Sequence, residues 1–100
     1  MNISDRYRVL VDEIRNLQSG AGDPKAERLL VQAVEELAHH EEGVGEIPQM
    51  RLEAQLTPIL LKAHNLLDRA RLLFDELGEE DRVGAVWEAE QKIYRLLNSL

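Results

Sequence analysis

The sequence predicts an all-α fold, an antiparallel four-helix bundle built from two helical hairpins within one domain, residues 1–100. Two observations carry this prediction. Apolar residues recur at alternating spacings of three and four, which places them on one face of a helix. Glycine and proline clusters interrupt that pattern and mark the connections. No segment has the sustained alternation of polar and apolar residues that is typical of strands, and short connections favour antiparallel packing of neighbouring helices.

The first half of the chain predicts a hairpin of two helices. The first helix has Ser4 as its N-cap and ends at the glycines that follow its last leucine. The second begins at Asp23 as N-cap, with Pro24 at the first helical position, where its missing N–H costs nothing. We expect this helix to continue to about Glu42. The segment 43–48, with two glycines and a proline, then separates the two hairpins.

The second half predicts one long helix and one shorter helix. The long helix runs from about Gln49 to Leu77 with a kink at Pro58, because proline leaves the carbonyl four residues earlier without its partner. Its predicted core stripe consists of Leu52, Leu56, Ile59, Ala63, Leu66, Ala70, Leu73 and Leu77. After Gly78, the last helix has the predicted stripe Val86, Ala89, Ile93, Leu96 and Leu100.

Composition and charge narrow the range of partners. The formal net charge is −7, which argues against nucleic acid and anionic membranes, because both attract clustered Lys and Arg. The chain has no cysteine, so it has no disulfide, zinc–thiolate or iron–sulfur site. No apolar run approaches the length of a transmembrane helix or a signal peptide. We expect a soluble cytoplasmic protein without nucleic-acid or membrane partners.

The last two predicted helices carry more apolar residues than a bundle core needs, which is roughly three of every seven positions. Either a wide core covers this surplus within one chain, or a partner covers it. Aromatic residues are enriched at the centres of protein interfaces. We therefore predict a non-enzymatic interaction module, an adaptor, chaperone or regulator that pairs as a homodimer. Its predicted partner-binding residues are Val83, Trp87, Tyr94, Leu97, Leu61 and Leu72.

A histidine-dependent bundle is the alternative function. Glu36 and His39 match the Glu-x-x-His element of di-iron bundles. A complete di-iron site needs two such elements and two further glutamates. His64 lies mid-helix, one position off the predicted stripe, and we expect it to be accessible to solvent. This placement resembles that of the phosphate-accepting histidine in a helical phosphotransfer domain. The sequence contains no Gly-rich phosphate loop and no nucleophile elbow. We therefore expect no catalytic residue, no metal and no cofactor.

Overall fold

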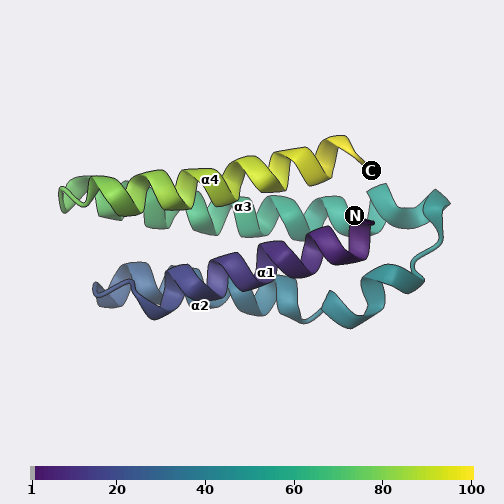
Figure 1. Ribbon diagram of the computed structural model, residues 1–100, viewed down its shortest axis with the longest axis horizontal. Coiled ribbons are helices and arrows are strands. Elements are labelled where there is room, and N and C mark those ends of the chain that lie inside the picture. The colour runs from purple at the N-terminus through teal and green to yellow at the C-terminus, as the bar shows by residue number, and fades with distance from the viewer. Residues whose placement is uncertain (1) are drawn as a thin grey trace.

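The computed structural model describes residues 2–100 and confirms the all-helical four-helix bundle (Figure 1). Its α-helices are α1 (Ile3–Ser19), α2 (Pro24–Ala38), α3 (Leu52–Glu76) and α4 (Glu80–Asn98). Each helix contacts the next, and α1 also contacts α4, so the four form a closed ring around the core. Within residues 2–100, α1 lies diagonally across the core from α3, and α2 lies diagonally across it from α4. No helix in this range combines the length and the hydropathy that crossing a bilayer requires.

The N-termini of the first two helices follow their local sequence. The side chain of Asn2, not that of Ser4, caps α1, because Asn2 Oδ1 accepts a hydrogen bond of 2.8 Å from the Asp5 backbone N–H. Ser4 lies inside the first turn, so the helix begins earlier than predicted. Asp23 caps α2 as predicted, accepting from the Ala26 backbone N–H at 3.0 Å.

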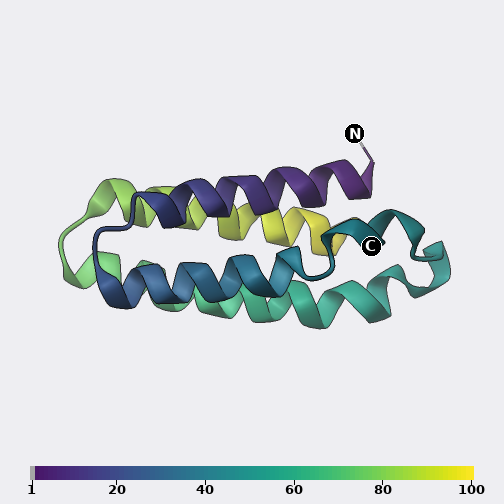
Figure 2. The same cartoon turned by 90° about the horizontal axis from the view of Figure 1, so that it is seen from below.

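The end of α2 differs from the prediction. The helix stops at Ala38, before the expected Glu42, and a 3-10 helix, η1 (Glu41–Glu46), occupies most of the predicted break. A second 3-10 helix, η2 (Gln49–Arg51), replaces the first turn of the predicted long helix, so α3 begins at Leu52 and not at Gln49. Figure 2 shows the chain leaving the line of α2 before it forms η1. Two contacts explain this path. Val44 of η1 is buried where η1 packs against α1, and the Tyr7 hydroxyl donates a 2.6 Å hydrogen bond to the Leu37 carbonyl.

α3 runs without interruption through Pro58. It ends in a Schellman motif, in which the Glu79 N–H donates to the Phe74 carbonyl at 2.9 Å and the Gly78 N–H donates to the Asp75 carbonyl at 3.1 Å. Gly78 has a φ of 73°, a conformation that glycine adopts without a Cβ penalty. This motif stops α3 one residue before the predicted Leu77 and starts the turn into α4.

The buried stripe of α3 is rotated relative to the prediction. Its buried residues are Leu52, Leu56, Leu60, Ala63, Leu67, Ala70 and Phe74. Leu60, Leu67 and Phe74 are buried in place of the predicted Ile59, Leu66 and Leu73, which are only half-buried. The predicted Leu77 is exposed. The rotation follows from the position of α3 between α2 and α4, which leaves two flanks of the helix in contact with neighbours. The stripe of α4 agrees with the prediction at Val86, Ala89, Ile93 and Leu96, whereas Leu100 is half-buried.

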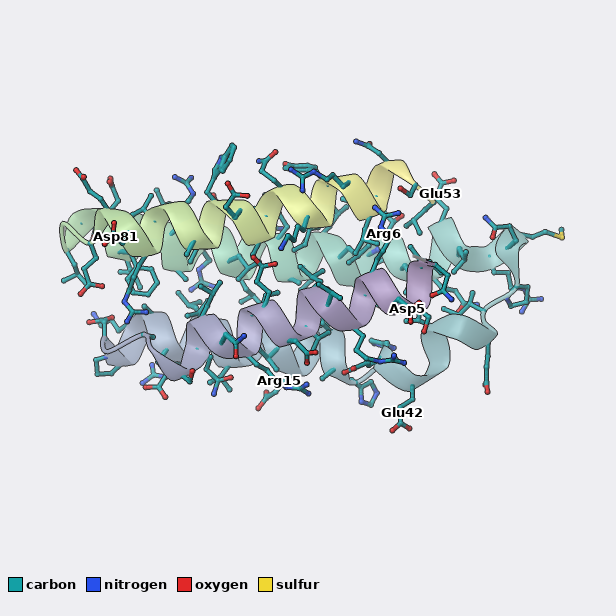
Figure 3. All side chains as sticks on the ribbon, in the orientation of Figure 1. Asp5, Arg6, Arg15, Glu42, Glu53 and Asp81 are labelled. Carbon is teal, nitrogen blue, oxygen red and sulfur yellow. The ribbon has the colours of Figure 1, made fainter. Side chains whose placement is uncertain are left out.

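Acidic residues gather at both ends of the bundle. Figure 3 shows Asp81 near one end of its long axis and Glu42 in the other half of the molecule. At the η1 end, Glu41 lies 3.9 Å from the Nε atom of Arg8 and 4.0 Å from an Nη atom of Arg15. The two α1 arginines therefore partly neutralise this acidic end from within the same chain.

Candidate functional site

Four of the predicted partner-binding residues lie on one flank of α4. Val83, Trp87, Tyr94 and Leu97 follow one another at spacings of four, seven and three residues, so they share one side of the helix. Val83 and Leu97 are half-buried against the core. Trp87 is 49% exposed and Tyr94 is 45% exposed. These two aromatic side chains are therefore the accessible part of this flank, which we call the aromatic flank of α4.

A buried carboxylate lies between this flank and α3. The Glu90 side chain is only 4% exposed, and its Oε1 atom lies 3.2 Å from Nε2 of His64. Its Oε2 atom lies 3.2 Å from Nε of Arg71. His64 and Arg71 are seven residues apart, two turns along the same side of α3, so Glu90 is held between them. We use the name Glu90 cluster for four residues: Glu90, His64, Arg71 and Asp68.

Arg71 directs its hydrogen bonds to Asp68 and not to Glu90. Its Nε and Nη2 atoms both donate to Asp68 Oδ1, at 3.1 and 2.8 Å. Glu90 Oε2 is therefore shielded from solvent and accepts no hydrogen bond, although the arginine charge is close. A buried oxygen without a donor costs about 1–3 kcal/mol. This cost makes the charged form of Glu90 unfavourable in the folded chain.

The two carboxyl groups of the cluster have opposite pKa shifts. The pKa of Glu90 is raised to about 7, chiefly by burial and then by the neighbouring Asp68, while Arg71 opposes the rise. The hydrogen bonds from Arg71 lower the pKa of Asp68 below its ordinary value. Glu90 therefore gains and loses a proton near neutral pH while Asp68 remains charged. Chemically, Glu90 can hold or release a proton at a buried position between α3 and α4.

His64 is less accessible than predicted. Its side chain is 16% exposed, and its ring packs edge-on against Tyr94, with ring centroids 4.8 Å apart. The rotation of the α3 stripe explains this result, because it moves His64 toward the α4 side of the core. With Nε2 facing Glu90, phosphate transfer through this histidine would have to use Nδ1.

The cluster also gives the register of α3 against α4. Glu90 contacts both His64 and Arg71, and Tyr94 contacts His64. In an antiparallel pair these contacts place Leu61 at the level of Leu97. Leu61 is exposed and continues the surface next to the aromatic flank of α4.

Leu72 belongs to a different surface. It is exposed, but it lines a groove between α2 and α3, together with Leu29 and Leu73. The predicted set of six partner-binding residues is therefore divided between two sides of α3, with Leu72 on the side of α2.

Glu36 and His39 occupy the opposite end of this α2–α3 surface. Glu36 Oε2 lies 3.1 Å from Nζ of Lys62, and the rings of His39 and His40 pack edge-on with their centroids 4.9 Å apart. These four side chains line a groove of about 510 Å³. Residues 2–100 contain no group of three or more His, Cys, Asp or Glu side chains that could hold a metal ion.

Replacing both His39 and His40 with glutamine should leave the free energy of unfolding within about 0.5 kcal/mol of the wild-type value, because neither side chain is fully buried. Urea denaturation checks the stability, and elemental analysis of protein purified without chelator checks for metal. A metal that is present in the wild type and lost from this double variant would contradict the prediction.

Glu90 is the residue that sequence reasoning missed. A lone glutamate on a helix is ordinarily solvated, and Glu90 immediately follows the predicted core residue Ala89. The sequence feature that could have indicated Glu90 was the seven-residue spacing of His64 and Arg71 on α3, which offers two basic side chains to one anion on a facing helix.

Comparisons with protein-family models, with curated proteins and with solved structures found no significant match to this chain.

Proposed function

We propose that this chain is a non-enzymatic protein–protein interaction module that pairs with a second copy of itself through the aromatic flank of α4. The observation that carries the proposal is the exposure of Trp87 and Tyr94, each about half accessible on one side of one helix. A short chain has few places to cover such groups, because its surface is large relative to its volume. Tyrosine and tryptophan are also enriched among the few residues that contribute most of the binding energy of protein interfaces.

Two-fold pairing is the form of association that we favour. In a two-fold dimer the same patch lies on both sides of the interface, so one aromatic flank would cover its copy. Leu61, Val83 and Leu97 border the two aromatic side chains and would extend the apolar contact. The Glu90 cluster would then lie beneath the interface, further from solvent than in the single chain.

The alternative, a histidine-dependent bundle, has less support. The Nε2 atom of His64 is occupied by Glu90, and Glu36 is paired with Lys62. His64 is thus not open to a phosphate donor at Nε2, and the carboxylate that would join His39 at a metal ion is already paired with a lysine.

Trp87→Ala should convert a dimer into a folded monomer, because it removes the largest exposed apolar side chain of the flank. Tyr94→Glu should do the same by placing a charge in the interface. Light scattering across the micromolar range measures the mass, and circular dichroism verifies that each variant remains helical.

Leu77→Ala provides the matched control. Leu77 is 53% exposed, but it lies at the turn that follows α3 and outside the aromatic flank. This variant should remain dimeric. A monomeric wild type, or equal dissociation of the Leu77 variant, would refute the proposed interface.

A further inference from the structure

The groove between α2 and α3 has an unusual charge for this acidic chain. It measures about 450 Å³. Three cationic residues and one carboxylate line it, in a protein whose net charge is −7. We call it the basic groove, and its lining residues are Lys25, Arg28, Leu29, Gln32, Arg69, Leu72, Leu73 and Glu76.

The three cations of the basic groove have no anionic partner. Within residues 2–100, Lys25, Arg28 and Arg69 take part in no ion pair, and Glu76 of the same groove is paired with none of them. Six other Lys and Arg side chains do form ion pairs in this range, as Lys62 does with Glu36. All three groove cations are also exposed. Their positive charge is therefore available to a molecule from outside.

The floor of the same groove is apolar. Leu29 is buried, Leu73 is half-buried, and Leu72 is 49% exposed. A free phosphate would use the cations and leave these leucines uncovered. An uncharged apolar helix would cover the leucines and leave the cations unpaired. An amphipathic helix with acidic borders would both cover the leucines and pair with the cations.

We infer that the basic groove is a docking site for an acidic amphipathic helix of a protein partner. The incoming helix lies along the line between α2 and α3 and places its apolar side chains against Leu29, Leu72 and Leu73, in the mode by which helices dock into grooves. Its glutamate or aspartate side chains reach Lys25, Arg28 and Arg69 from the borders. The inference is independent of the proposed dimer, because none of these residues belongs to the aromatic flank of α4.

The test uses the full chain and a labelled synthetic helix of about four turns, with leucine on one face and glutamate on both borders. Fluorescence anisotropy should give a dissociation constant in the micromolar range, about 1–100 μM. A second peptide has glutamine in place of every glutamate and should bind about tenfold more weakly, because it loses the charge contacts. Equal binding of the two peptides, or no binding of the glutamate peptide, would overturn the inference.

Charge-reversal variants locate the site. Arg28→Glu and Arg69→Glu should each weaken binding of the glutamate peptide about tenfold. Arg51→Glu makes the same change in net charge at an exposed arginine outside the groove and should weaken it less than about twofold. Equal losses in all three variants would mean that only the net charge matters, and would overturn the assigned site.

Two further measurements separate the possible occupants. Trp87→Ala should leave peptide binding unchanged, so failure of the proposed dimer would not affect this result. Vesicles containing phosphatidylserine should not bind the chain, since its net charge is negative. Vesicle binding that Arg28→Glu and Arg69→Glu abolish, without peptide binding, would assign the groove to a membrane surface and refute the inference.

Discussion

Ala63→Glu should abolish cooperative folding or reduce the free energy of unfolding by about 4 kcal/mol or more. Ala63 is fully buried on α3. A carboxylate at this position would have to leave water without a cation to pair with, and it would also not fit the space that an alanine fills. Ala70→Glu should have the same effect, because Ala70 is equally buried two turns further along the same stripe.

Urea denaturation followed by far-ultraviolet circular dichroism measures these losses. Asn65→Glu is the matched control, because Asn65 is exposed on the same helix. This control should change the free energy of unfolding by less than about 0.5 kcal/mol. A similarly small effect of Ala63→Glu would mean that the buried face of α3 is wrongly assigned.

Glu90→Gln should stabilise the chain at pH 8 by roughly 2–3 kcal/mol and have little effect at pH 4. The folded chain holds the pKa of Glu90 at about 7, above its ordinary value of 4.5. The stability contributed by the protonated form is therefore fully present below about pH 4.5 and is lost as the pH rises through about 7. Glutamine has the shape of the protonated acid and never ionises, so the variant escapes this loss.

The measurement is the urea midpoint of wild type and variant at several pH values between pH 4 and pH 8. Glu88→Gln makes the same substitution at an exposed neighbour on α4 and should not stabilise the chain at pH 8 by the same amount. If Glu90→Gln is less stable than the wild type at pH 8, the attraction of His64 and Arg71 for the carboxylate exceeds its cost of burial, and the prediction fails.

The number, order and type of the helices could be predicted from the sequence, because the spacing of apolar residues and the glycine and proline signals agree with one another. The rotation of α3 could not be predicted. Its leucines and its phenylalanine occupy adjacent positions, as in Leu66 with Leu67 and Leu73 with Phe74. Two neighbouring stripes therefore have nearly equal hydrophobicity. The contacts of α3 with both α2 and α4 decide between them.

The candidate site was predictable only in part. The aromatic flank follows from periodicity within α4 alone, so Trp87 and Tyr94 could be assigned to one face. The Glu90 cluster depends on the register of α3 against α4, which no local pattern records. The early end of α2 likewise depends on contacts between distant segments, the hydrogen bond from Tyr7 to Leu37 and the burial of Val44 against α1.

The closed ring of helices has a consequence for the order in which the chain folds. Three of its four interfaces join helices that are consecutive in the sequence, and only the interface of α1 with α4 joins the two ends, as in the hydrogen bond from Arg6 to Ser99. Closing a chain segment costs entropy that grows with its length. The hairpins of α1 with α2 and of α3 with α4 can therefore form early from local contacts, whereas the pairing of α1 with α4 must wait until the central connection has brought the hairpins together. The slow step of folding is thus expected to be the docking of two hairpins and not the formation of any helix.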